Sequence, residues 1–427
     1  MGNFYMPIVL FYPKHQLQQG PKHLSKLLEN SFSKAISYHQ PWVGSLSDNV
    51  TIHCDDIGAE FFEVEVNCPM DQVVHHPDSA FPPGLPWRNV PPAQDGGCLS
   101  IAQLSHFECG GIAVNACMSH KVGDACSAFF FLKDWATLTR KYPNGELACA
   151  PCYVQDSLVP SQPGGPLDFP VMVEPNTQDC IDFEKRFFLS ESNIRKLKAF
   201  ISSDKSSTVQ NPTTTEVVSA LFYKCAATAS ANSSNTSNSN DSSSQLVLVS
   251  DLRKTIPPSI QSTTTIGNIL TEFSTPTYNL QDLRLPKLVS DIRKSKLELS
   301  NKDNFKKDTW ISEMLEYTNK VNTRTKDAQS YLQKSSCHDV YRCSSICNMP
   351  YQDFDFGWGR PSRANMASAP FNNMLFLMNT HDQSKGIEVF INLNQQQMSI
   401  FEQDRDLLQF ATPHLHDEEE KYCIGAY

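Results

Sequence analysis

The chain has 427 residues, of which 40% are hydrophobic and 19% are charged, and its net charge is −10. This composition is typical of a globular protein, and a chain of this length usually forms two domains. It argues against a membrane protein, because no stretch approaches the roughly 20 apolar residues of a membrane helix. The negative charge likewise argues against a nucleic-acid partner.

The start of the chain and its cysteines indicate the expected compartment. Residues 1–13 show neither the basic region nor the cleavage site of a secretory signal, so we expect a cytoplasmic protein. Fourteen cysteines are scattered along the chain, and Cys149-Ala-Pro-Cys152 is a C-x-x-C pair without a second pair at zinc spacing. We therefore expect reduced thiols and no metal site.

The first 150 residues predict a mixture of helices and strands. Apolar residues recur every three or four positions at 24–37 and 125–140, which predicts helices. Shorter apolar or alternating segments predict strands at 61–66, 99–104 and 111–119. Proline and glycine are then frequent between 151 and 180, which we interpret as a linker between two halves.

Residues 181–427 continue this mixture. A tract of Ser, Asn and Thr at 230–245 is too polar to offset its ordering entropy, which predicts a disordered loop. Helices are expected at 192–202, 212–224, 286–299 and 310–326, and strands at 246–249, 374–378 and 386–393. The sequence thus predicts an α/β protein with an N-terminal domain over 1–150 and a C-terminal domain over 181–427.

Two residues stand where the 111–119 strand gives way to the 125–140 helix. His120 follows the strand and Asp124 directly precedes the helix. Asp is a preferred helix N-cap and a single His is commonly a hydrogen-bonded core residue, so spacing alone favours structural roles. The chemical alternative is that His120 takes a proton from an alcohol, because only an imidazole ordinarily titrates near neutral pH.

A second candidate segment is the turn Asp353-Phe-Asp-Phe-Gly-Trp-Gly-Arg-Pro361. Gly357 and Gly359 bracket an aromatic residue, and glycines at such positions allow a positive φ or a close approach of the backbone. Taken alone, a turn of this kind is more often structural than catalytic.

Together, His120-Lys-Val-Gly-Asp124 and Asp355-Phe-Gly-Trp-Gly359 resemble the H-x-x-x-D and D-F-G-W-G motifs of the plant BAHD acyltransferases, in the family's order. Phe107-Glu-Cys-Gly-Gly111 and Ile266-Gly-Asn268 resemble two further landmarks. The resemblance runs from about Pro7 to the last strands. Within the family, the chain looks most similar to alkaloid O-acetyltransferases of the vinorine synthase type.

The resemblance implies a monomer of two chloramphenicol-acetyltransferase-like α/β domains with mixed sheets. A long crossover would join them, and a channel would lie at their interface. Acyl-CoA, as a co-substrate and not a bound cofactor, and a small-molecule alcohol would meet at His120. This residue would remove the hydroxyl proton and later return it to the CoA sulfur.

The resemblance also assigns roles around His120. Asp124 would point away from the channel and pair with an arginine, for which Arg253 is the candidate, and so hold the position of His120. Asp355 is counted among the catalytic residues, although its turn with Gly357 and Gly359 suggests that it shapes the domain interface.

Some residues depart from the family. Ile346 and Asn348 replace the Trp and Arg of an S-W-x-R segment, Ser45 replaces the Arg of a Y-P-L-A-G-R segment, and the chain starts after the position of the family's first strand. Acetyl is the favoured acyl group, because Thr265-Ile-Gly-Asn-Ile269 lacks the aromatic-Phe-Gly-Asn-Cys segment of malonyl users. The acceptor would be an alkaloid or terpenoid alcohol. The alternatives are a transferase of malonyl or another acyl group and a catalytically silent binding scaffold.

Overall fold

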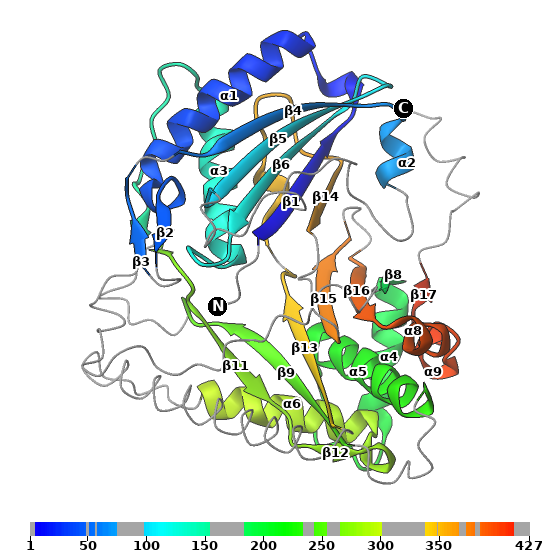
Figure 1. Ribbon diagram of the computed structural model, residues 1–427. Coiled ribbons are helices and arrows are strands. Elements are labelled where there is room, and N and C mark those ends of the chain that lie inside the picture. Colours follow the sequence, from blue (N-terminus) through cyan, green and yellow to red (C-terminus); the bar gives the residue numbers. More distant parts are fainter. Residues whose placement is uncertain are drawn as a thin grey trace, which may run out of the picture.

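The computed structural model describes residues 5–47, 51–55, 58–74, 98–153, 183–233, 243–253, 265–300, 338–347, 349–366, 373–380 and 385–413. Two mixed sheets, each packed against helices, lie one above the other in Figure 1. The predicted helix at 310–326 and nearly all of the 151–180 linker fall outside the described residues. The mixed α/β architecture is the one that the sequence predicts.

The first sheet has the strand order β14-β1-β6-β5-β4. Only β4 and β5 pair in parallel, and the other pairs are antiparallel. The strands are β1 (Tyr5–Tyr12), β4 (Glu60–Val66), β5 (Ser100–Phe107), β6 (Ile112–Ser119) and β14 (Arg363–Met366).

One face of this sheet forms a large core with two helices, α1 (Pro21–Tyr38) and α3 (Ala125–Arg140). Alternation along β6 decides the face, because its residues 112, 114, 116 and 118 all belong to this core. The short helix α2 (Met70–Val74) packs with residues of the other face. The α3 bounds are those that the sequence predicts.

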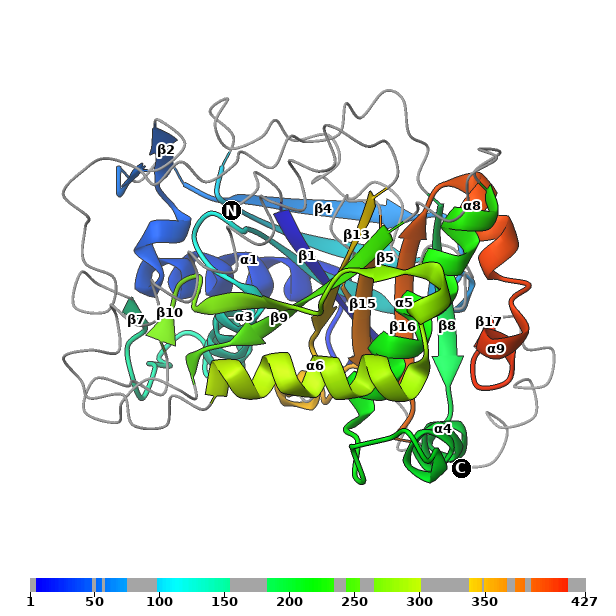
Figure 2. The same cartoon turned by 90° about the horizontal axis from the view of Figure 1, so that it is seen from below.

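The second sheet follows the order β11-β9-β13-β15-β16-β8-β17, with β12 also paired to β9. The helices α4 (Glu191–Ser203), α5 (Thr214–Ser233) and α6 (Leu285–Ser300) lie on the side of this sheet away from the first one (Figure 2). Helix α5 is apolar on almost every side, which is typical of a helix enclosed by its neighbours. The strands are β8 (Phe183–Leu189), β9 (Ser243–Asp251), β11 (Leu270–Ser274), β12 (Tyr278–Asn279), β13 (His338–Ser345), β15 (Met374–Asn379), β16 (Ile387–Leu393) and β17 (Thr412–Pro413).

Short elements complete the described chain. Strands β2 (Ser45–Ser47) and β3 (Thr51–His53) form a small antiparallel pair, and β7 (Cys152–Tyr153) pairs in parallel with β10 (Thr265–Ile266). The remaining helices are η1 (Lys14–Gln16), η2 (Gln40–Trp42), η7 (Leu280–Asp282), η8 (Tyr351–Asp353), α8 (Gln395–Phe401) and α9 (Arg405–Leu408). This β7–β10 pair fixes the start of the turn between β10 and β11 (residues 267–269), hereafter the β10–β11 turn, which contributes to the site described below.

The first sheet includes one strand from the second half of the sequence. Strand β14 comes from the second half of the sequence, yet it pairs with β1 and extends the first sheet. Its residues Ala364 and Met366 are buried in the first core. Pairing and burial thus draw β14 away from its neighbours in sequence, so the first sheet needs both halves of the chain.

The polar tract also differs from its prediction at both ends. Helix α5 continues to Ser233 and β9 begins at Ser243, so only 234–242 lies outside the described residues. Ser244 is buried, and its polar groups are satisfied there, because its hydroxyl lies 2.8 Å from the Tyr223 hydroxyl and its backbone pairs with β13. Composition underestimates this segment because backbone pairing can place small polar residues inside a sheet.

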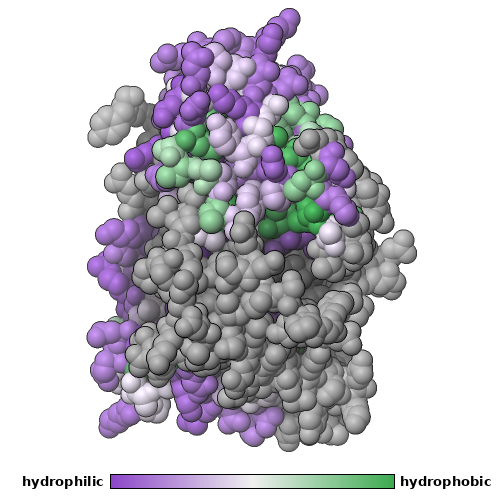
Figure 3. Space-filling model, turned by 90° about the vertical axis from the view of Figure 1, so that its left-hand side faces the viewer, coloured by the Kyte–Doolittle hydropathy of each residue, from purple (hydrophilic) through white to green (hydrophobic). Residues whose placement is uncertain are grey.

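One face of the molecule is mainly polar where its residues are described. Figure 3 shows the side of the molecule that carries α1, where hydrophilic residues predominate and apolar ones gather in small patches. Within the described part of the chain, no helix has the length and apolar character needed to span a membrane.

Candidate active site

His120 directly follows β6, where the chain turns toward α3. His120 is partly buried, and this burial lowers its pKa below the ordinary value of 6.5. Its own backbone, the Asp124 carboxylate and the Asn268 side chain act in the opposite direction on that pKa. The net shift favours the neutral imidazole, which is the form that can accept a proton.

Asp124 is the N-cap of α3, as the structural interpretation of the sequence requires. Its Oδ1 accepts a hydrogen bond from the backbone nitrogen of Ser127 at 3.0 Å. The same carboxylate also accepts from the backbone nitrogen of Ile269, 3.0 Å from Oδ2. The side chain that caps α3 therefore also binds the backbone of Ile269, in the second half of the chain.

Arg253 holds Asp124 with two hydrogen bonds, so the expected contact between them is present. Nη1 lies 2.8 Å from Oδ2, and Nη2 lies 2.9 Å from Oδ1. Burial alone would lower the pKa of Arg253, but the hydrogen bond and the charge of Asp124 raise it above its usual value. Both side chains are nearly buried, so breaking the pair would leave a buried charge without a counterion.

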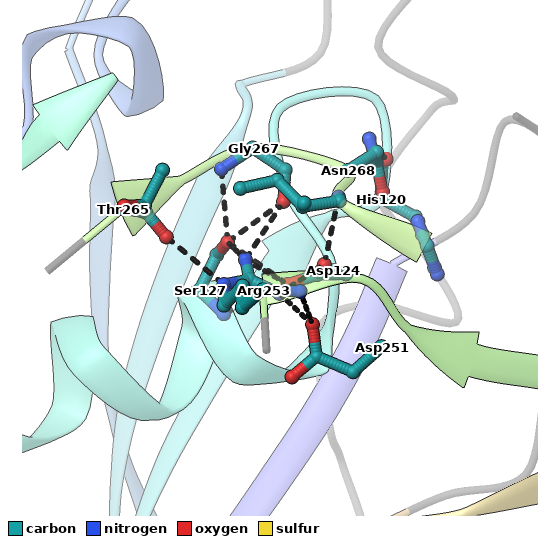
Figure 4. Close-up of polar contacts among 9 residues, drawn as sticks. His120, Asp124, Ser127, Asp251, Arg253, Thr265, Gly267 and Asn268 are labelled. Atoms are coloured by element: carbon teal, nitrogen blue, oxygen red, sulfur yellow. Dashed lines mark hydrogen bonds and ion pairs between the residues drawn. The ribbon is translucent and has the colours of Figure 1, made fainter. Parts of the chain in front are cut away.

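Arg253 makes further contacts that keep its guanidinium in one orientation. Nε donates to the carbonyl of Thr265 at 3.2 Å, Nη1 donates to Asp251 at 3.1 Å, and Nη2 donates to the carbonyl of Gly267 at 3.2 Å. Figure 4 shows these contacts converging on the arginine from α3, from the end of β9 and from the β10–β11 turn. These contacts join elements of the first and second sheets beside the loop of residues 120–124, hereafter the His120 loop.

The β10–β11 turn also contacts the His120 loop itself. The side-chain amide of Asn268 donates to the carbonyl of His120 at 2.8 Å, and the backbone nitrogen of Asp124 donates to the carbonyl of Gly267 at 3.3 Å. Gly267 has a φ of 139°, a conformation that favours glycine. In Figure 4 the imidazole points away from the Asp124–Arg253 pair, so that pair supports the loop without facing the ring's reactive side.

Sequence reasoning assigned no role to Ser127, Gly267 or Asn268. Gly267 and Asn268 entered only as part of a family landmark and of the segment that favours an acetyl donor. The sequence near Ser127 gives one weak indication of its role, because it is the third residue of a helix whose N-cap is Asp124. Its contact with Gly267 could not be predicted from neighbouring residues, because the two lie 140 positions apart.

The turn that contains Asp355 has a different setting. Oδ1 of Asp355 accepts from the backbone nitrogens of Gly357 at 2.8 Å and Gly359 at 2.9 Å. The two glycines have φ values of 116° and 103°, as the sequence predicts for such a turn. Arg140 of α3 donates to the Asp355 carbonyl. Among the described residues, no hydrogen bond joins Asp355 to His120, so the structure brings Asp355 to α3 and not to the imidazole.

Aromatic residues attach this turn to the first core. The Phe354 ring lies 5.3 Å from that of Phe129, and the Phe356 ring lies 5.1 Å from that of Trp135, both centroid to centroid. The hydroxyl of Tyr12 donates to the Phe354 carbonyl at 2.6 Å. The turn therefore stabilises the helix whose N-terminus carries Asp124.

The residues that depart from the family have separate positions. Ile346 is buried in the first core at 2% exposure, where an apolar side chain fits. Ser45 donates to the Asp55 carboxylate in the small β2–β3 hairpin region. Asn348 lies outside the described residues.

Comparison with known proteins gives a consistent result. Residues 2–408 match the family model described as "Transferase family". The chain is 35% identical over 423 residues to Acyltransferase Pun1 of Capsicum frutescens, covering 96% of this chain and 91% of that protein. It is 34% identical over 419 residues to 17,18-epoxy-17-hydroxycur-19-ene N-malonyltransferase of Strychnos nux-vomica, covering 96% and 84%. The crystal structure of vinorine synthase has a similar fold, with a TM-score of 0.69 at 22% identity over 96% of this chain and 91% of that one.

Proposed function

The chain belongs to the Transferase family, the BAHD acyltransferases that its two motifs resemble, and we propose that it transfers an acetyl group from acetyl-CoA to a hydroxyl of a plant alkaloid or terpenoid. Acyl-CoA is the co-substrate, and the acceptor is a small molecule. The observation that carries this proposal is the position of His120, a partly buried residue on a loop (residues 120–124) that contacts from Asn268 and Arg253 hold.

His120 is the general base in this proposal. Its neutral imidazole takes the hydroxyl proton while the alcohol oxygen attacks the thioester carbonyl. The tetrahedral intermediate then collapses, the carbon–sulfur bond breaks, and the imidazolium returns the proton to the CoA sulfur. No acyl group becomes attached to the protein, because binding both substrates beside one base is sufficient.

Asp124 and Arg253 are positioning residues in this scheme. The Asp124 carboxylate accepts from Arg253 at both oxygens, from Ser127 at Oδ1 and from Ile269 at Oδ2, so in this scheme it acts by holding the loop. Asp355 acts through the turn with Gly357 and Gly359 that packs on α3. We place the acyl-CoA and acceptor sites in a channel between two domains, built from 1–150 together with β14 and from the rest of 181–427. A cytoplasmic monomer would suffice for this activity.

The choice of acyl group is the main alternative. The N-malonyltransferase similarity supports a malonyl donor, whereas Thr265-Ile-Gly-Asn-Ile269 lacks the segment typical of malonyl users. A silent scaffold would bind acyl-CoA without turnover. The enzyme is favoured because His120, Asp124 and the glycine turn are all present.

The test uses purified protein with acetyl-CoA, malonyl-CoA and a medium-chain acyl-CoA, each against a library of plant alkaloid and terpenoid alcohols. Free CoA thiol is followed spectroscopically, and products are identified by mass. We expect the highest turnover with acetyl-CoA and a product heavier than its alcohol by one acetyl group. Calorimetric binding of acetyl-CoA without thiol release in any combination would instead support the scaffold.

A further inference from the structure

Ser127 is a fully buried residue in the first turn of α3. Its backbone nitrogen already completes the helix cap by donating to Asp124 Oδ1. The cap therefore does not need the serine hydroxyl. Any residue with a backbone N–H could supply that bond, so the contacts of the hydroxyl require a separate explanation.

The hydroxyl of Ser127 lies at the junction of three segments. It is 3.1 Å from Nη2 of Arg253 and 3.0 Å from the backbone nitrogen of Gly267, both of which donate to it. It can give its own proton to Asp124 Oδ1 or to the carbonyl of Gly267, each at 2.9 Å. A hydroxyl has one proton and two lone pairs, so these contacts use its full hydrogen-bonding capacity.

The contacts of Ser127 lead directly to His120. Gly267 is followed by Asn268, whose amide holds the His120 carbonyl at 2.8 Å. On the other side, the His120 loop passes so close that a Cβ at Gly123 would lie 2.7 Å from the Ser127 Cβ. The Ser127 hydroxyl thus contacts Asp124 at the end of the His120 loop, Gly267 of the β10–β11 turn, and Arg253, which binds both.

We propose that Ser127 is a positioning residue for acyl transfer, whose hydroxyl fixes the Gly267–Asn268 turn and thereby the orientation of the His120 imidazole. This inference rests on the proposed role of His120 as the base. Removal of the hydroxyl leaves the cap in place but removes its two contacts with Gly267, so the turn is held less firmly and the base is present but less well placed. Misplacement of a catalytic group affects the chemical step more than binding.

The test compares Ser127→Ala with Ser219→Ala. Ser219 is also a fully buried helical serine, but its hydroxyl donates to Thr215 of its own helix α5 at 2.6 Å. With acetyl-CoA and the best alcohol of the panel, we expect Ser127→Ala to lower kcat about tenfold and to leave KM for acetyl-CoA within about twofold. We expect Ser219→Ala to change neither. Ser127→Cys, with a similar volume and a weak hydrogen-bonding group, should fall between wild type and Ser127→Ala.

A pH profile separates positioning from simple loss of stability. The Asn268 side chain raises the pKa of His120, so a loosened turn should move the acid limb of kcat/KM to lower pH in Ser127→Ala. All rates are taken well below the unfolding midpoint of each variant. The inference is overturned if kcat per folded molecule and the acid limb both match wild type.

The parallel variant His120→Ala distinguishes the two possible failures. If His120→Ala is inactive while Ser127→Ala and Ser127→Cys behave like wild type, only the role of Ser127 is wrong. If His120→Ala is as active as wild type, the proposed base is wrong and the inference about Ser127 falls with it.

Discussion

Among the described residues, two buried arginine–carboxylate pairs join the sheets, and they differ in what surrounds them. Arg253 holds Asp124 beside the His120 loop, whereas Arg363 of β14 holds Glu388 of β16 with contacts of 2.9 and 2.8 Å. Both pairs are nearly inaccessible to water. By charge and burial alone the two pairs would be equivalent.

The two pairs differ in the elements that their residues also contact. Asp124 also caps α3 and accepts from the β10–β11 turn, so its pair is continuous with the segment that carries His120. Arg363 also donates to Asn365 on its own strand, at 3.0 Å. A buried ion pair by itself is weak evidence of stabilisation or of function. The functional importance of such a pair therefore depends on which elements it holds in place.

The largest expected effect is that of Asp124→Ala. It leaves Arg253 buried without its partner and removes the α3 cap, so the free energy of unfolding should fall by about 3–5 kcal/mol. The kcat of the folded fraction should fall as well, because the loop loses its anchor. Urea unfolding and steady-state kinetics measure the two effects. Adding Arg253→Met should recover part of the stability and none of the kcat, and full recovery of kcat would refute the positioning role.

The matched change in the other pair is Glu388→Ala. It also leaves a buried arginine without its carboxylate, so we expect a loss of about 3 kcal/mol in the free energy of unfolding. Well below the unfolding midpoint, kcat should stay within about twofold of wild type, since Arg363 and Glu388 lie on β14 and β16 and not in the His120 loop. A drop in kcat as large as that of Asp124→Ala would remove the distinction between the two pairs.

The Asp355 turn provides an intermediate case. Asp355→Ala loses the acceptor for two backbone nitrogens and should lower the free energy of unfolding by about 1–3 kcal/mol. Asp355→Asn keeps an oxygen at that position, so it should retain most of the stability and most of the kcat. Inactivity of a well-folded Asp355→Asn variant would show that the carboxylate itself takes part in the reaction.

The smallest expected effect is a shift in pH dependence. Burial lowers the pKa of His120, so the acid limb of kcat/KM for wild type should lie below 6.5. Asn268 acts to raise that pKa, and Asn268→Ala should therefore move the limb further toward acid pH. A limb above 6.5, or a shift toward alkaline pH in the variant, would contradict this assignment.

Local patterns in the sequence predict much of this region. The bounds of α3 follow from its apolar periodicity and its Asp124 cap, and the alternation of β6 places its core face correctly. The Arg253 partner came from the family resemblance and not from spacing. Each of these features depends on neighbouring residues or on a known motif.

Other features depend on contacts between residues distant in sequence. Four residues of β14 carry too little pattern to reveal that they extend the first sheet, which is decided by pairing with β1. Ser127 and Asn268 look like ordinary polar residues until the fold brings the β10–β11 turn to the His120 loop. The catalytic motif was thus predictable, while the residues that hold it in place were not.

Acyl transfer by His120→Ala tests the role of the imidazole most directly. With acetyl-CoA and the best acceptor alcohol, we expect the rate of CoA thiol release to fall by about 10²–10⁴, the usual contribution of a general base. The unfolding midpoint and the affinity for acetyl-CoA should stay close to those of wild type. An unchanged rate of thiol release and product formation would contradict the assignment of His120 as the base.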